Sequence, residues 1–440
     1  MKVLVLGSGA REHALVRALL ADPQVESVTA APGNAGIAAD VECRPLEGSL
    51  SDGPAVVRLA QAVAADLVVI GPESPLVAGV ADHVRAAGIA CFGPSAAAAR
   101  LEGSKAFAKE VMAAAGVPTA RSRACTTTDQ ATDALDEFGA PYVVKDDGLA
   151  AGKGVVVTDN RMLALAHAAQ CLNRSVGPGE PAPAVVIEEY LDGPEVSLFC
   201  LTDGTTVLPL APVQDFKRVR DGDDGPNTGG MGAYSPLDWA PPGLVQEVLD
   251  TVARPTIEEM ARRGTPFAGV LYVGLALTSN GTRVVEFNAR FGDPETQAVL
   301  ARLRTPLGGV LLAAATGRLA DVGKLQWRPE HAVTVVIAAK GYPGGPRKGD
   351  VIEGLDELLD LAPAVTVLHA GTTRTASGRL AADGGRVLSV VAIGDDLAQA
   401  RHRAYAAVDR IRLKGSHHRR DIALAAAQGR IVVPGVGSRA

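Results

Sequence analysis

The sequence has few cysteines, and none are spaced as a metal site or a redox pair would be. The five cysteines of the 440-residue chain lie far apart, and there is no Cys-x-x-Cys motif. We interpret them as small, buried apolar residues of a protein in a reducing compartment. The eight histidines form no cluster with the spacing of metal ligands either.

Long apolar runs and an excess of positive charge are also missing. No segment approaches the roughly 18 consecutive apolar residues that a membrane-spanning helix requires. Residues 1–7, MKVLVLG, are typical of a strand entering a turn and lack the longer apolar stretch of a signal peptide. The net charge of -6 argues against nucleic acid or an anionic membrane as a partner, because either needs a basic face. We therefore expect a cytoplasmic protein.

Lysine is scarce as well, with ten lysines against 33 arginines. Four of the lysines lie in the motifs described below, namely Lys105, Lys145, Lys153 and Lys217. A lysine brings a compact, mobile charge where an arginine brings a rigid fork. These four positions are therefore candidates for contacts that need a mobile point charge.

A chain of this length exceeds one ordinary hydrophobic core, and its residue pattern changes several times. Apolar strands alternate with helical stretches up to about residue 103, which predicts a parallel sheet with helices on both faces. A smaller α+β segment follows to about residue 190, with a hairpin around residues 142–157. Strands and helices then return, broken by a loop at residues 221–232. The last hundred residues are predicted to be short strands joined by Gly/Pro turns.

The first candidate ligand site is the turn Gly7-Ser8-Gly9, which follows a strand and precedes a helix. The free amides at a helix N-terminus favour a phosphate, and Arg11 is a further candidate contact. A dinucleotide fingerprint would need glycine where Glu12 stands, and an acidic residue to hold the ribose at residues 30–33, which are AAPG. We therefore favour a phosphorylated small molecule over NAD. A tight turn without a ligand stays open.

The strongest local motif is KDDGLAAGKGV at residues 145–155. Lys145 ends a predicted strand, and Gly152 and Lys153 lie near the tip of the following loop. Glycines let backbone amides close over phosphate oxygens, and lysines neutralise phosphate charge. The motif is not a P-loop, because Gly154 stands where that loop needs Ser or Thr. An ordinary hairpin turn is the alternative.

Two further segments fit a nucleotide. An apolar strand at residues 185–188 runs into a polar turn whose backbone could bond an adenine, and Glu195 follows at a distance suited to ribose hydroxyls; a plain strand end is the alternative. Farther along, Glu286, Asn288 and Arg290 share one face of a predicted strand. A carboxylate and an amide oxygen suit Mg²⁺, and an adjacent guanidinium suits a phosphoryl group or a carboxylate. Polar residues on a solvated face are the alternative here.

In this order, these residues resemble the ATP-grasp superfamily, and longer blocks resemble its phosphoribosylamine–glycine ligase family. The resemblance spans nearly the whole chain in collinear order. The blocks are REHA (11–14), APGNAG (31–36), GPE (71–73), LEGSKAF (101–107), DGLAAGKGV (147–155), GPNTGGMGAYSP (225–236), EFNARFGDPET (286–296), HAGT (369–372) and GGRVL (384–388).

The resemblance implies an α/β fold with an α+β lid in four parts. These are an N-terminal Rossmann-like domain on the phosphoribosylamine side (1–103), a central ATP-grasp domain (104–120 plus 191–327), an ATP-grasp lid (121–190) and a small β-rich C-terminal domain (328–440). It further implies ATP and Mg²⁺, with Mn²⁺ possible, glycine and 5-phosphoribosylamine as substrates, and a monomer.

The resemblance also implies roles for individual residues. For ATP it implies Lys105, Lys145, Gly152, Lys153, Glu188, Leu191 and Glu195. For the metal it implies Glu286 and Asn288, and for the reacting groups Arg290, Asp293, Lys217 and Asp215. For substrate binding it implies Gly9, Arg11, Glu12, Arg218 and Gly230.

The chemistry agrees with such a ligase, because phosphorylation by ATP turns a carboxylate into a group that an amine can attack. Such a reaction needs positioning and charge neutralisation, and the motifs contain no Ser/His/Asp or Cys/His arrangement. Three alternatives remain at this point. They are another ATP-grasp ligase or a biotin carboxylase, which the block at residues 225–236 disfavours, a dehydrogenase, which Glu12 disfavours, and a non-catalytic ATP-binding module.

Overall fold

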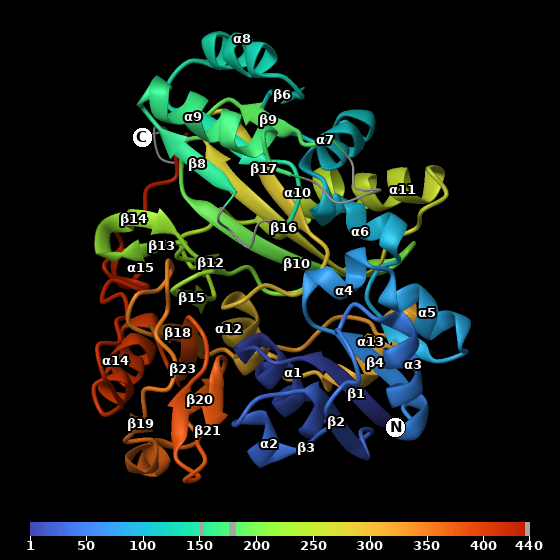
Figure 1. Cartoon of the computed structure of the whole chain (residues 1–440), viewed down its shortest axis with the longest axis vertical. Helices are drawn as coiled ribbons and strands as arrows, with labels where there is room; N and C mark the ends of the chain where they lie inside the picture. Colours follow the sequence, from blue (N-terminus) through green and yellow to red (C-terminus); the bar gives the residue numbers. More distant parts are fainter. Residues whose placement is uncertain (150–153, 176–181, 436–440) are drawn as a thin grey trace.

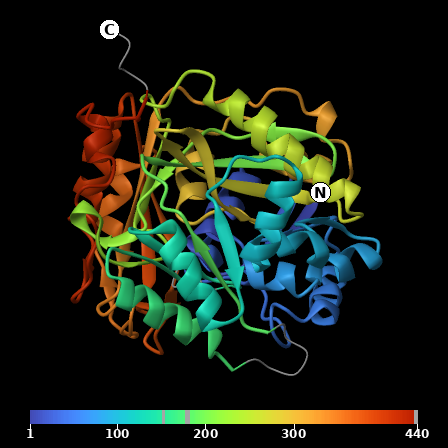
Figure 2. The same ribbon diagram turned by 90° about the horizontal axis from the view of Figure 1, so that it is seen from above.

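The structure is a computed structural model that describes residues 1–149, 154–175 and 182–435. In Figure 1 the N-terminal segment (blue) and the C-terminal segment (orange to red) lie at the lower right and lower left. Seen from above, the same two segments occupy opposite sides of the molecule (Figure 2). In Figure 1 a central sheet lies above both segments and a smaller layer lies above that sheet, so segments distant in sequence meet near the middle.

The N-terminal segment contains a five-stranded sheet in which every pair of neighbours is parallel, as predicted. Its order is β3 (Glu42–Cys43), β2 (Ser27–Pro32), β1 (Lys2–Gly7), β4 (Leu67–Ile70) and β5 (Ala90–Phe92). Leu4 and Leu6 enter one hydrophobic core, whereas Val3 and Val5 enter another. Burial of both faces explains why β1 is an unbroken apolar run, since a strand with one wet face would alternate. The helices are α1 (Ala10–Leu20), α2 (Ile37–Asp40), α3 (Gly53–Ala62), α4 (Glu73–Val77), α5 (Val80–Ala86) and α6 (Ala96–Gly103).

The upper layer is a four-stranded antiparallel sheet with its own small core. Its order is β6 (Ser122–Cys125), β9 (Val185–Glu188), β7 (Tyr142–Asp146) and β8 (Val155–Thr158). The predicted hairpin is present, with Lys145 opposite Val155. Two helices, α8 (Thr128–Phe138) and α9 (Arg161–Leu172), pack together on this layer, and α7 (Lys105–Ala114) precedes it. We refer to this layer as the upper sheet.

The central sheet is antiparallel and consists of β11 (Val207–Pro209), β10 (Glu195–Asp203), β16 (Ala268–Thr278) and β17 (Gly281–Asn288). A β-bulge interrupts the pairing of β16 with β17, because Gly274 pairs with Glu286 whereas Leu275 pairs with Val284. Val285 is therefore the extra residue of β17 and has no partner across the ladder. Helices α10 (Leu244–Val248), α11 (Arg254–Arg262), α12 (Glu295–Arg302) and α13 (Leu307–Ala315) belong to this part of the chain.

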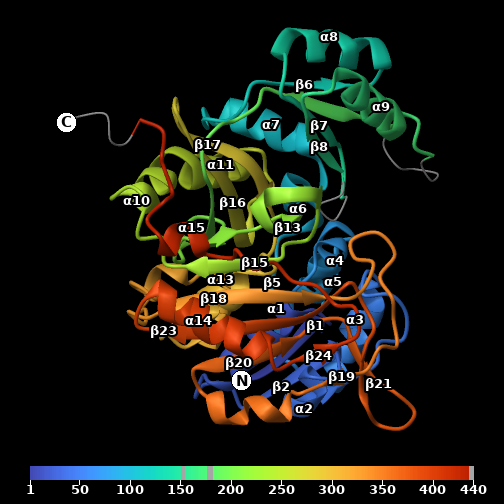
Figure 3. The same ribbon diagram turned by 90° about the vertical axis from the view of Figure 1, so that its left-hand side faces the viewer.

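A fourth sheet joins two regions of the sequence. Its order is β12 (Gln214–Asp215), β15 (Gly232–Ser235), β18 (His331–Ala338), β23 (Arg386–Gly394) and β20 (Val365–His369). β15 pairs with β18 across about a hundred residues, so the block at 225–236 supplies a strand of the C-terminal sheet (Figure 3). The prediction of short strands only was wrong, because β18 and β23 are long and helix α14 (Leu397–Val408) packs on both. Asp396 caps α14 by accepting from the amide of Gln399.

Residues 221–232, which were predicted to be a loop, contain regular secondary structure. They contribute β14 (Asp224–Asn227), which pairs with β13 (Arg218–Arg220) in a hairpin. Gly222 at the tip has a φ of +68°, which explains glycine there. The remaining small elements are β19 (Ile352–Glu353), β21 (Thr372–Arg374), β22 (Leu380–Ala382), β24 (Arg412–Leu413) and α15 (Leu424–Ala427). Within the described ranges, the helices all fall short of the combined length and apolarity that crossing a bilayer demands.

Candidate active site

The side chain of Lys145 joins the upper sheet to the central sheet. It is 4% exposed on β7, and its Nζ lies 2.8 Å from Oε2 of Glu188 on β9. The same Nζ donates to the carbonyl of Val285 at 2.9 Å, which is free because of the bulge in β17. Lys145, which was predicted to bind phosphate, thus contacts Val285 beside Glu286, although 140 positions separate Lys145 from Val285 in sequence.

Glu188 lies between two lysines, one of which the sequence reasoning did not single out. Lys109 on α7 places its Nζ 3.1 Å from Oε1 of Glu188, and it also donates to Thr119. Burial lowers the pKa of Lys109, and the Glu188 carboxylate opposes that shift. Lys109 follows Lys105 by one helical turn, and this spacing was the signal that could have identified it.

Lys105 binds the loop that follows β7. Its Nζ donates to the carbonyls of Asp146 and Gly148, at 2.9 and 3.0 Å. Asp147 accepts from the amide of Ala106 at 3.1 Å, so the loop also caps the start of α7. Two of the predicted nucleotide contacts, Gly152 and Lys153, lie outside the described residues. Leu191 is half-buried in the segment that follows β9.

Glu286 and Asn288 both lie on β17 beyond the bulge and are half-buried. Their spacing of two places them on one face of the strand. Burial alone would raise the pKa of Glu286, but Lys217, Lys145 and Lys105 together lower it below its usual value. Three lysines from separate motifs therefore act on this one carboxylate. Within the described ranges, no group of three or more His, Cys, Asp or Glu side chains could hold a metal ion without other ligands.

Asp215 and Lys217 form a cluster of charged side chains with Glu195, at the start of β10. Lys217 is paired with Glu195, and its Nζ lies 3.9 Å from Asp215. Burial raises the pKa of Asp215 to about 7, and the positive charge of Lys217 only partly offsets this effect. The pKa of Lys217 is raised, because the attraction of Asp215 and Glu195 outweighs the effect of burial. Glu195, predicted to face ribose, is thus engaged by a lysine in this structure.

A hydrogen-bonded chain that sequence reasoning missed lies next to this charged cluster. Tyr272 on β16 donates to Glu295 Oε1 at 2.9 Å, and its hydroxyl oxygen lies 2.6 Å from Ser197 Oγ. Burial raises the pKa of Glu295. No protein partner reaches its Oε2 in the part of the chain that the structure describes. Glu295 was visible in the sequence only as a residue of the 286–296 block.

The turn at Gly9 is arranged differently from a simple phosphate loop. Glu12 accepts from the Gly9 amide at 2.6 Å, and Arg11 donates to the same carboxylate at 2.6 Å. The Glu12 side chain fills space that only glycines leave open, since a Cβ at Gly9 or Gly71 would lie 2.7 or 2.0 Å from its oxygens. The helix amide predicted to receive phosphate is therefore occupied by a carboxylate from the first turn of α1.

Arg290 continues the polar face of β17 into the N-terminal segment. Its guanidinium lies 3.0 Å from Glu102 and 3.5 Å from Glu73. Burial would raise the pKa of Glu73, but Arg290 and then Arg11 lower it below its usual range. Burial raises the pKa of Glu102, which also accepts from the amide of Ala289 at 2.8 Å. Arg290 is thus held by two carboxylates at the junction of the N-terminal and central parts.

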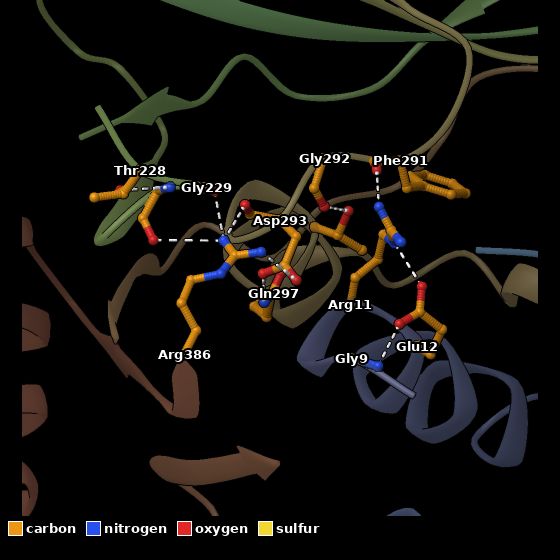
Figure 4. A network of polar contacts seen from close by, with 12 residues as sticks. Gly9, Arg11, Glu12, Thr228, Gly229, Phe291, Gly292, Asp293, Gln297 and Arg386 are labelled. Carbon is orange, nitrogen blue, oxygen red and sulfur yellow. Dashed lines mark hydrogen bonds and ion pairs between the residues drawn. The ribbon is translucent and has the colours of Figure 1, made fainter. Parts of the chain in front are cut away.

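Asp293 lies where several segments converge (Figure 4). Its Oδ1 accepts from Gln297 at 2.8 Å, and its Oδ2 would lie 3.5 Å from a Cβ placed on Gly9. Gly230 packs on the next residue, since a Cβ there would lie 2.3 Å from Cδ of Pro294. Arg218 lies farther along, where it donates to the carbonyl of Gly225 within its own hairpin.

These positions form one region that combines four lysines, two arginines and several carboxylates from the N-terminal segment, the upper sheet and the central part of the chain. Lys105, Lys145, Glu188, Glu286 and Asn288 lie where the upper sheet meets the central sheet, and Lys217 and Asp215 lie beside Glu195 at the start of β10. Gly9, Arg11, Glu12, Arg290, Asp293 and Gly230 lie below it, toward the N-terminal sheet. The region offers positive charge for phosphates, hard oxygen ligands and buried acids near one another.

Comparisons with known proteins give one consistent result. Residues 1–102, 103–296 and 332–425 match the family models described as the N domain, the ATP-grasp (A) domain and the C domain of phosphoribosylglycinamide synthetase. A phosphoribosylamine–glycine ligase of Streptomyces coelicolor is 63% identical over 97% of this chain and all of its own length. One from Mycobacterium leprae is 58% identical over 98% of this chain and all of its own.

Solved structures agree with the sequence matches. The crystal structure of phosphoribosylamine–glycine ligase from Thermotoga maritima has a TM-score of 0.82 and 32% identity, and it covers 96% of this chain and all of its own. The biotin carboxylase domain of 2-oxoglutarate carboxylase from Hydrogenobacter thermophilus has a TM-score of 0.68, covering 94% of this chain and 91% of its own. At 18% identity the latter shows the fold alone.

Proposed function

The chain belongs to the phosphoribosylglycinamide synthetase family, and we propose how its residues carry out the reaction of that family. The enzyme joins glycine to 5-phosphoribosylamine at the expense of ATP and forms glycinamide ribonucleotide, ADP and phosphate, a reaction of purine biosynthesis. Membership of this family excludes the three alternatives, which were a dehydrogenase, another ATP-grasp ligase or biotin carboxylase, and a non-catalytic ATP-binding module.

The reaction proceeds in two steps that need no protein nucleophile. A glycine carboxylate oxygen first attacks the γ-phosphorus of ATP, so that glycyl phosphate forms and ADP leaves. The amine of phosphoribosylamine then attacks the glycyl carbonyl, loses a proton and displaces phosphate. Both steps move negative charge between oxygens, so the main tasks of the protein are to align the reactants and to supply positive charge.

Lys105 and Lys145 bind the phosphates of ATP in this proposal, together with Gly152 and Lys153. Each of the first two lysines is now held by backbone carbonyls, and Lys145 also by Glu188. Such a partner sets the lysine in place before the nucleotide arrives, which reduces the entropy lost on binding. Glu188, Leu191 and Glu195 hold the adenosine. The hydrogen bond from Lys145 to Val285, beside Glu286, is the observation that carries the proposal.

The side chains on β17 fit a magnesium ion bound with the nucleotide. Glu286 provides a carboxylate that neighbouring lysines keep ionised, and Asn288 provides an amide oxygen on the same face. Two protein oxygens are few, which suits Mg²⁺ that completes its shell with phosphate oxygens and water. Such an ion would neutralise charge on the phosphates. The family implies a divalent metal, and we propose Mg²⁺, with Mn²⁺ as the alternative.

The remaining residues orient the two substrates. Arg290, fixed by Glu73 and Glu102, neutralises charge on the glycine carboxylate or the transferring phosphoryl group. Asp215 and Lys217 face the amino acid, and Asp293 faces the reacting groups. The ribose and its phosphate lie toward the N-terminal turn, with contributions from Gly9, Arg11, Glu12, Arg218 and Gly230. Because the Gly9 amide already donates to the Glu12 carboxylate, this turn binds hydroxyl groups more readily than a phosphate.

We also propose a function for each of the four parts of the chain. Residues 1–103 bind phosphoribosylamine, 104–120 and 191–327 carry the reaction, 121–190 cover the nucleotide, and 328–440 complete the site. The protein acts as a cytoplasmic monomer on small molecules, and the net charge of -6 supports the absence of a nucleic-acid partner.

Phosphate release with each substrate omitted in turn tests the reaction. ATP, glycine and freshly generated phosphoribosylamine together should give equimolar ADP, phosphate and glycinamide ribonucleotide, the last identified by mass spectrometry. Omission of any one substrate should abolish the product. Product formation without glycine, or with another amino acid at equal efficiency, would contradict the proposal.

A further inference from the structure

Arg386 is a C-terminal residue whose side chain reaches the proposed active site. It is the first residue of β23 and follows Gly384 and Gly385. Its guanidinium extends to the junction between the 229–230 turn and the start of α12 (Figure 4). The mechanism given above assigns no role to this side chain, although it touches two residues that the mechanism uses.

The guanidinium contacts Asp293 twice. Its Nη1 donates to the backbone carbonyl of Asp293 at 2.6 Å, and its Nη2 lies 3.1 Å from the carboxylate Oδ2. Nη1 also donates to the carbonyl of Gly229 and, at 3.4 Å, to that of Gly230. One planar group therefore fixes the main chain and the side chain of Asp293 and the facing turn at once.

The surrounding glycines make this approach possible. A Cβ at Gly229 would lie 2.9 Å from the Cζ of Arg386. A Cβ at Gly230 would lie 2.3 Å from Pro294 Cδ and 3.2 Å from the Asp293 carbonyl oxygen. Any side chain at either position would push the turn away from the guanidinium. The pair of glycines and Arg386 therefore act as one unit.

The Asp293 carboxylate is held from both sides. Gln297 binds Oδ1, Arg386 binds Oδ2, and Oδ2 points toward the Gly9 turn, where a Cβ would be 3.5 Å away. Without Arg386 the Oδ2 atom would lose its charged partner, and the carboxylate could rotate. A misplacement of about 1 Å in such a group can cost about 100-fold in rate.

We propose that Arg386 is a positioning residue for the second step, in which the amine attacks the glycyl carbonyl. It acts by orienting the Asp293 carboxylate and the 229–230 turn against the Gly9 side of the site. This inference rests on the proposed function, in which Asp293 faces the reacting groups. The C-terminal segment is then part of the catalytic apparatus and not only a neighbour of it.

A merely structural ion pair would behave differently. The side chains of Arg386 and Asp293 are 22% and 12% exposed, so the pair is mostly buried and its loss costs some stability in either case. A merely structural role would slow both steps of the reaction in parallel with that loss of stability. The positioning role predicts instead that the second step slows while the first step is nearly unchanged.

The experiment compares Arg386→Ala, Arg386→Lys, Asp293→Asn and the double variant Arg386→Ala/Asp293→Asn in the full-length enzyme. Arg379→Ala is the matched control, because Arg379 belongs to the same segment and forms an exposed pair with Glu353. Steady-state kcat and KM are measured for all substrates, and melting temperatures monitor folding. Glycine-dependent positional isotope exchange in ¹⁸O-labelled ATP, without phosphoribosylamine, measures the first step alone.

We expect Arg386→Ala to lower kcat for ligation about 10- to 100-fold while isotope exchange stays within about 3-fold of wild type. Arg386→Lys retains the charge but lacks the planar guanidinium, so its kcat should be at least about 5-fold below that of wild type. This variant serves as the test if Arg386→Ala does not fold. Methylguanidinium should partly restore kcat in Arg386→Ala. The double variant should be no slower than the slower single variant, since both act through one group.

Several results would overturn the inference. A rise only in KM for phosphoribosylamine would make Arg386 a substrate contact, and fully additive losses would make it independent of Asp293. An active Arg386→Lys would show that charge alone suffices. Wild-type activity in Asp293→Asn together with a slow Arg386→Ala would show that Arg386 does not act through the Asp293 carboxylate. The omission assay would still establish the reaction itself.

Discussion

The buried pair of Lys145 and Glu188 allows a quantitative prediction. The two side chains are 4% and 3% exposed, so water cannot replace the contact at 2.8 Å. Lys145→Met removes this pair and the hydrogen bond to Val285. A carboxylate left wholly uncompensated in a protein interior costs about 3–5 kcal/mol, but Lys109 remains 3.1 Å from its other oxygen. We therefore expect a loss of about 2–3 kcal/mol, near the value of one charge-assisted hydrogen bond.

A double-mutant cycle isolates the interaction. Glu188→Gln also removes the partner of Lys109, so the double variant Lys145→Met/Glu188→Gln should be destabilised by less than the sum of the two single variants, with a coupling of at least about 1 kcal/mol. Hydrogen exchange of the β7 and β9 amides gives the local free energy of opening. This quantity is preferable to a global free energy of unfolding, because a chain of several parts need not unfold in one step.

The pair of Arg161 and Asp136 is the matched control within the same upper layer. Its side chains are 37% and 58% exposed, and its shortest contact is also 2.8 Å. The cycle with Arg161→Met and Asp136→Asn should give a coupling below about 0.5 kcal/mol. Equal couplings for the two pairs would refute the argument from burial.

Two further predictions concern the substrate side. Because burial raises the pKa of Asp215 to about 7, the carboxylate is uncharged below that pH and ionised above it, so kcat/KM for glycine should rise between pH 6 and 8. Asp215→Asn should abolish this rise, and a persisting rise would assign it to another group. Gly230→Ala should reduce stability and ligation more than Gly264→Ala. Both glycines have positive φ, but only Gly230 meets Pro294, whereas nothing lies near a Cβ at Gly264. Equal melting temperatures and activities would contradict the packing argument.

Much of the fold could be predicted because local patterns encode it. The run at residues 3–6 predicted a buried parallel strand, and both its faces are covered. The hairpin at residues 142–157 and the shared face of Glu286 and Asn288 follow from turn chemistry and strand alternation. The ATP-grasp architecture was implied by the resemblance of the motifs, in their order, to that superfamily.

What could not be predicted depends on contacts between distant segments. The pairing of β15 with β18 leaves no local signal, and the sequence reasoning assigned the two strands to separate parts of the chain. The bulge at Val285 arises from register between two strands and not from either strand alone. Arg386 lies in the block at residues 384–388, but the block assigns no role to it, and its position beside Asp293 does. The Gly9 turn followed the phosphate pattern, yet the carboxylate of Glu12 takes the amide.

The affinity for ATP, measured by calorimetry with and without Mg²⁺, tests the central claim most directly. If the lysine segments and β17 form one nucleotide site, Glu286→Gln/Asn288→Ala should bind free ATP at least as well as wild type but gain little affinity from the metal. Lys145→Met should bind more weakly in both conditions. Full enhancement by Mg²⁺ in Glu286→Gln/Asn288→Ala would contradict the account, because the metal would then be bound elsewhere.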